Sequence, residues 1–142
     1  MRKSLLTLLL IAVAVGMKAQ SADKPFRAYL YNKEYEVFLR INLYEQDITV
    51  PGQELYGELP GYLGKQRNSF CWVIPSAKVI SETEAELKMI NDFGSEDLTA
   101  ILKRENDSTY VLHQTKGSTI KVPRNGKWQK LPKTLALKRN TH

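Results

Sequence analysis

The clearest pattern in the chain is an alternation of apolar and polar residues between positions 35 and 43. Every second residue of this stretch is apolar, and most of the residues between them are polar. Successive side chains of a β-strand point to opposite faces, so this period of two predicts a strand with one buried face. A second strand-like run at 26–31 precedes it at hairpin distance, across three polar residues. We therefore expect an opening β-hairpin whose second strand belongs to the core.

Short stretches of similar character recur along the chain and are separated by turn residues. The run 70–74 is apolar throughout and predicts a buried strand that ends at Pro75. The segment 60–69, which contains proline and glycine, predicts a loop. Asn125-Gly126 predicts a tight turn with positive φ angles. The remaining predicted strands lie at 48–50, 55–59, 98–102, 110–112, 120–122 and 135–137.

Residues 77–91 fit two kinds of element. Between positions 82 and 89, Glu or Lys alternates with Thr, Ala, Leu and Met, which is a strand pattern. However, Ser81 with Glu84 matches a helix capping box, and most of these residue types favour helices. We expect a strand, because periodicity is the stronger signal. The alternative is an α+β fold with one helix near 81–93 packed on an antiparallel sheet.

About eight short strands with short connections predict an all-β fold, an antiparallel up-and-down meander that closes into a barrel or folds into a sandwich. Four features support a family resemblance: the strand at 35–43, the glycines Gly57 and Gly61, the hairpin at 98–114 and the closing run at 127–131. In these features the chain resembles the lipocalin-like, calycin-type small barrels that bacteria of the Bacteroidetes type export. The resemblance implies a closed barrel. The G-x-W signature of lipocalins is absent near the start, so no ligand-binding residue is carried over.

The first residues predict export. Two basic residues after Met1 are followed by an apolar run that ends at Val15, which is typical of a secretory signal peptide and too short to span a bilayer. We expect cleavage after Ala19, which gives a signal peptide at 1–19, a single domain at 20–142 and no transmembrane segment in the mature chain. The only cysteine, Cys71, is far from this run, so we do not expect a lipoprotein. The expected location is periplasmic or extracellular.

Charge is distributed unevenly along the chain. All fifteen acidic residues lie before position 108, and eight Lys or Arg residues follow it. These cations either pair with acids across the sheet or form a surface that attracts an anionic envelope polymer. Nucleic acid is a poor partner for an exported chain. The candidate anion-binding residues are Lys127, Lys130, Lys133, Lys138 and Arg139.

Catalytic and metal-binding patterns are lacking in the sequence. There is no G-x-S-x-G motif, and the two histidines and one cysteine have no metal-ligand spacing. Three glutamates at 82, 84 and 86 are typical of a solvated strand face rather than of an acid–base pair. We therefore expect no enzyme activity, no metal and no cofactor. Asp107-Ser108-Thr109 resembles the O-glycosylation acceptor of bacteria of the same type, which makes Ser108 a candidate modification site.

Aromatic residues are the best candidates for a binding site. They are numerous for a domain of this size, and both barrel mouths and sugar-stacking surfaces use such residues. We expect a non-enzymatic binding module for a small apolar or carbohydrate ligand or a protein partner. The alternative is a surface-interaction protein that docks on anionic envelope polymers through its basic C-terminal third. The candidate ligand-binding residues are Tyr56, Tyr62, Trp72 and Trp128.

Overall fold

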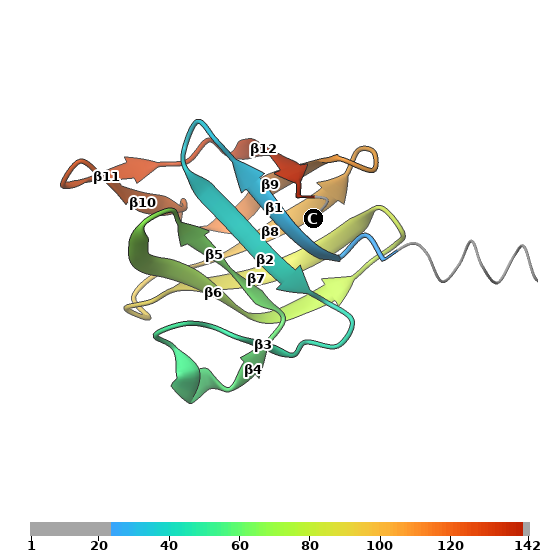
Figure 1. The fold of residues 1–142 in the computed structure, drawn as a ribbon, viewed down its shortest axis with the longest axis horizontal. Helices are drawn as coiled ribbons and strands as arrows, with labels where there is room; N and C mark the ends of the chain where they lie inside the picture. Colours follow the sequence, from blue (N-terminus) through green and yellow to red (C-terminus); the bar gives the residue numbers. More distant parts are fainter. Residues whose placement is uncertain (1–23, 141–142) are drawn as a thin grey trace, which may run out of the picture.

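The computed structural model describes residues 24–140 and confirms an all-β, antiparallel fold (Figure 1). Eight strands close into a barrel in the order β1-β12-β9-β8-β7-β6-β5-β2, which is an up-and-down meander. This architecture is consistent with the lipocalin-like resemblance. The barrel strands are β1 (Arg27–Asn32), β2 (Val37–Asn42), β5 (Gly61–Lys65), β6 (Asn68–Val79), β7 (Glu84–Asn91), β8 (Asp97–Arg104), β9 (Thr109–Gly117) and β12 (Thr134–Arg139).

Two short hairpins are inserted between consecutive barrel strands and pair only within themselves. The first contains β3 (Ile48–Thr49) and β4 (Glu58–Leu59), and the second contains β10 (Lys121–Arg124) and β11 (Lys127–Lys130). The predicted strand at 55–59 is wrong over most of its length, because a 3₁₀ turn covers Glu54–Tyr56. Gly57 follows this turn with a φ of 73°, a left-handed value that interrupts a strand.

The interior of the barrel is filled by apolar side chains. Each of the eight strands contributes to one buried cluster, which includes Leu39 of β2, Leu87 of β7 and Leu112 of β9. Phe26 and Tyr110 meet edge to face within this cluster, with ring centroids 6.5 Å apart. The alternating residues at 35–43 therefore build a core face, as their period predicts.

A second, smaller cluster lies on the outer side of the barrel wall. Ile48 and Leu59 of the β3–β4 hairpin pack there with Tyr62, Cys71 and Val73, which point outward from β5 and β6. This hairpin therefore covers part of the sheet that would otherwise expose apolar side chains to water.

The predicted loop at 60–69 is wrong, because Gly61–Lys65 forms β5, a barrel strand. Two glycines of β5 have no room for a side chain. A Cβ atom on Gly64 would lie 2.4 Å from the ring of Phe38, and one on Gly61 would lie 2.2 Å from the carbonyl oxygen of Arg40. Glycine in this strand is thus required by packing rather than by a turn.

The prediction that the next strand ends at Pro75 is also wrong, because β6 continues past it through a register shift between Val73 and Ser76.

The ambiguous segment is a strand, β7, and the helix alternative near 81–93 is wrong. Ser81 does not cap a helix. Its hydroxyl oxygen accepts hydrogen bonds from the backbone N–H groups of Thr83 and Glu84, at 3.2 Å each, and so closes the turn between β6 and β7. The same local preference that resembles a helix start therefore stabilises a hairpin.

The predicted tight turn at Asn125-Gly126 is confirmed. Their φ angles are 53° and 75°, and they join β10 to β11. In the part of the chain that the structure describes, no helix has the length and apolar character needed to cross a membrane. The predicted signal peptide at 1–19 lies outside the described residues.

Candidate functional site

A pocket opens at one end of the barrel, between the β7–β8 turn and the β10–β11 hairpin. It has a volume of about 190 Å³ and an aromatic and polar lining. The β10–β11 hairpin projects from the barrel beside it (Figure 1). The lining residues are Phe70, Trp72, Asn91, Phe93, Ser95, Glu96, Lys121 and Trp128.

Three aromatic rings meet at the pocket. The ring of Phe70, at the start of β6, lies 5.0 Å from that of Trp128 and 6.2 Å from that of Phe93, measured between centroids. Phe70 is buried, whereas Phe93 and Trp128 are 72% and 57% exposed. The three rings come from three separate segments, so the barrel end and the hairpin together hold an aromatic surface that faces water.

Trp72 forms the inner side of the pocket. It is fully buried, and its indole N–H donates a hydrogen bond of 3.0 Å to the backbone carbonyl of Lys121. This bond ties the start of β10 to the barrel wall. The neighbouring side chains Ile120, Val122 and Leu131 belong to the main core, so the base of the hairpin is fixed by packing as well.

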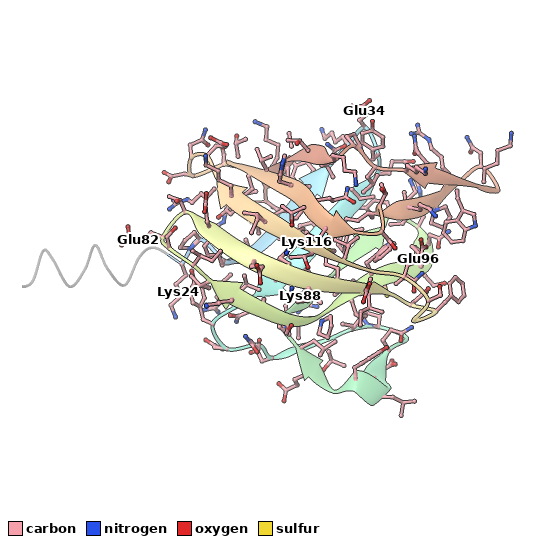
Figure 2. The ribbon with its side chains drawn as sticks, turned by 180° about the vertical axis from the view of Figure 1, so that it is seen from behind. Lys24, Glu34, Glu82, Lys88, Glu96 and Lys116 are labelled. Atoms are coloured by element: carbon pink, nitrogen blue, oxygen red, sulfur yellow. The ribbon has the colours of Figure 1, made fainter. Side chains whose placement is uncertain are left out.

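Polar groups form the rim on the β7–β8 side. The side-chain oxygen of Asn91 accepts hydrogen bonds from the backbone N–H groups of Ser95 and Glu96, at 2.9 and 3.3 Å, and so fixes the turn. Glu96 then forms an ion pair with Lys121, with 3.2 Å between carboxylate oxygen and ammonium nitrogen. Figure 2 shows Glu96 at the end of the barrel beside the hairpin. The rim therefore offers one hydroxyl, one carboxylate and one ammonium group in fixed positions.

The hairpin presents one of its faces to the pocket. Lys121 lies directly opposite Lys130, and Pro123 lies opposite Trp128. Side chains alternate along a strand and directly opposed residues share a face, so these four residues lie on one side of the hairpin. Val122 points the other way and is buried in the core.

The structure brings together two of the four predicted ligand-binding aromatics. Trp72 and Trp128 line the same pocket, one from the core and one from the hairpin. Tyr62 is buried in the second cluster beneath the β3–β4 hairpin. Tyr56 lies in the 3₁₀ turn and is 46% exposed. The last two residues are therefore not part of this site.

The predicted anion-binding residues lie in two regions. Lys127 and Lys130 belong to β11, and Lys133 follows that strand. Lys138 and Arg139 lie in β12, where Lys138 donates to the hydroxyl of Thr109 and Arg139 donates to the backbone carbonyl of Arg27. Of these five residues, Lys127 and Lys130 belong to the hairpin that borders the pocket.

Neither Ser108 nor Cys71 belongs to the lining of the pocket. Ser108 is exposed in the turn between β8 and β9. Cys71 is buried in the second cluster, and this burial, with a smaller effect of the Asp92 carboxylate, raises the pKa of its thiol from 9.0 to about 11. Within residues 24–140, no three His, Cys, Asp or Glu side chains are placed to hold a metal ion.

Sequence reasoning missed most of the site. Phe70 was assigned only to the core, and Phe93, Asn91, Glu96 and Lys121 were not selected. One signal was available for Phe93, because a large aromatic residue in the polar turn Asp92-Phe93-Gly94-Ser95 has no part in a strand pattern. The pairing of this turn with a hairpin some thirty residues away was not visible in the sequence.

Comparisons of the chain with protein-family models, with curated proteins and with solved structures found no match. The geometry of the pocket is therefore the basis for the function proposed for this protein.

Proposed function

We propose that this protein is a non-enzymatic binding module that holds a carbohydrate in the pocket between the β7–β8 turn and the β10–β11 hairpin. The observation that carries the proposal is the pair of exposed rings, Phe93 and Trp128, placed beside Phe70 in one pocket. Large aromatic rings are usually buried, and exposed rings gathered at a concave surface are typical of ligand contacts.

A sugar fits this pocket better than a fully apolar ligand. A pyranose ring has an apolar face of C–H groups, which stacks on aromatic rings, and an edge of hydroxyls, which need hydrogen-bonding partners. The rim supplies such partners through Ser95, Glu96 and Lys121. An apolar ligand of the kind that lipocalins enclose would need a cavity inside the barrel, and the inward side chains of all eight strands occupy that space.

A binding role is also supported by the chemistry of the pocket. Glu96 is the carboxylate that lines it, and it forms an ion pair with Lys121. Acid–base catalysis on sugars uses two carboxyl groups in different environments. The lining of this pocket contains one carboxyl group, so we propose binding without turnover. We also propose that the protein acts outside the cytoplasm.

Isothermal titration calorimetry with a panel of neutral and acidic oligosaccharides tests the proposal. Trp128→Ala and Phe93→Ala should each weaken the binding of a glycan by roughly 2- to 13-fold, because one aromatic contact contributes about 0.5–1.5 kcal/mol. Tyr56→Ala is the matched control, since it removes an exposed ring outside the pocket. The proposal fails when no glycan binds, or when the control weakens binding as much as the pocket variants do.

A further inference from the structure

The β10–β11 hairpin places cations in two directly opposed pairs. Lys121 lies opposite Lys130, and Arg124 lies opposite Lys127. Like charges at directly opposite positions destabilise an antiparallel pair. The sequence between 120 and 131 contains no acidic residue that could offset them from within the hairpin. Folding alone therefore does not account for this arrangement.

The two pairs have different surroundings. Arg124 donates hydrogen bonds to the side chain of Gln129 and to the backbone carbonyl of Glu34, at 3.2 and 3.4 Å. These bonds occupy the guanidinium at the tip of the hairpin, on the face that carries Val122. The pair of Lys121 and Lys130 lies on the other face, with Trp128 and the pocket.

On the pocket side, one positive charge is left without a counter-charge. Glu96 neutralises Lys121 at 3.2 Å. Lys130 is exposed and forms no ion pair or hydrogen bond with any residue of the described range 24–140. The ammonium group of Lys121 also has three N–H donors, so its contact with Glu96 leaves donors that can bind a ligand. An anion beside Trp128 would relieve the repulsion between the two lysines and accept hydrogen bonds from both.

We infer that the sugar held by this protein is acidic, with a carboxylate or sulfate group bound between Lys121 and Lys130 while its ring stacks on Trp128. This inference rests on the proposed function and specifies its ligand class. Charge-assisted hydrogen bonds to an anion are stronger than those to a neutral hydroxyl, so the acidic group determines which glycan is selected. The contribution of the lysines weakens with added salt, whereas ring stacking does not.

The decisive comparison uses tetragalacturonic acid and its methyl ester, which have the same sugar chain and differ in charge. Calorimetry at 50 and 300 mM NaCl should show at least tenfold tighter binding of the acid at low salt, with a smaller ratio at high salt. A sulfated chondroitin disaccharide and its desulfated form make the second pair. A preference only for the acid over its ester identifies the anion as a carboxylate, and a preference only for the sulfated form identifies it as a sulfate.

Variants locate the effect on the hairpin. Lys130→Gln should remove most of the preference for the acid over the ester. Lys133→Gln is the control, because Lys133 is an exposed cation outside the hairpin. The melting temperature of Lys130→Gln should be unchanged or higher, since the substitution relieves a repulsive pair, whereas a purely structural role for Lys130 would lower it.

The outcomes separate this inference from the proposed function. Equal affinity for the acid and the ester, together with equal affinity for the sulfated and desulfated chondroitin forms, overturns the inference, and the proposed function stands if Trp128→Ala still weakens binding. An equal loss in the Lys130 and Lys133 variants also overturns it, because the attraction would then come from overall charge. Absence of binding by every neutral and acidic glycan overturns the proposed function itself.

Discussion

Substituting Gly64 by alanine tests the packing of the barrel wall directly. A Cβ atom at this position would lie 2.4, 2.8 and 3.0 Å from three ring carbons of Phe38, all closer than or at the limit of real contacts. That ring is stacked on Tyr29 at 5.3 Å and meets Tyr62 edge to face at 5.6 Å. The added methyl group therefore has to displace a ring that is held on two sides.

The expected cost follows from two opposing effects. Overpacking of this kind destabilises a protein by about 1–3 kcal/mol. Alanine in place of glycine within a strand contributes about 0.5–1 kcal/mol in the favourable direction, because it restricts the unfolded chain. We expect a net loss of roughly 1–2 kcal/mol for Gly64→Ala. In a Phe38→Ala background the obstacle is absent, so the same substitution should stabilise the protein by about 0.5–1 kcal/mol.

Urea unfolding of the four proteins of this cycle, followed by tryptophan fluorescence, measures the coupling between the two positions. Gly126→Ala is the control. Its φ is +75° and nothing lies within 4 Å of the added atom, so it should cost roughly 1–2 kcal/mol in both backgrounds. An equal cost of Gly64→Ala with and without the Phe38 ring would refute the packing argument.

Three further predictions concern the core, the thiol and export. Leu39→Ala should lower the free energy of unfolding by roughly 2–5 kcal/mol, whereas Arg40→Ala, at an exposed position, should change it little; comparable losses would show that β2 is buried on both sides. Because the pKa of Cys71 is raised from 9.0 to about 11, native protein should not react with Ellman's reagent at pH 8, and stability should fall as pH rises from about 9 to about 11; rapid labelling of folded protein would contradict this. Mass spectrometry of the exported protein should give a chain that starts near Gln20, and retention of Met1 would refute the predicted signal peptide.

The sequence allowed most of the barrel to be predicted, because most strands have one face toward the core and one toward water. In β7 and β8, buried and more exposed residues alternate along the whole element, which is the pattern the period-two argument detects. β5 shows no such alternation, because all five of its residues are buried. The β3–β4 hairpin covers its outer side, so no alternation was left to detect, and its glycines were taken for turn residues.

The site was harder to predict than the fold, because it is made by two segments that meet only in space. Trp128 was selected for its residue type, and it lines the pocket together with Trp72. Phe93 was missed because it lies in a turn, where period-two alternation gives no signal. The significance of Lys130 depends on which residue lies opposite it, and the register of a hairpin follows from its turn type and length rather than from its charges.

The way in which the second hairpin is inserted has an evolutionary consequence. The strands on either side of it, β9 and β12, pair directly with each other, so the barrel closes without using β10 or β11. Ile120, Val122 and Leu131 tie the base of the hairpin to the core, whereas its tip at 123–130 contributes no residue to that cluster. Outside the turn residues Asn125 and Gly126, mutations at the tip can therefore accumulate with little effect on folding. One scaffold could thus diversify its ligands by exchanging a handful of residues, as immune receptors do with their loops.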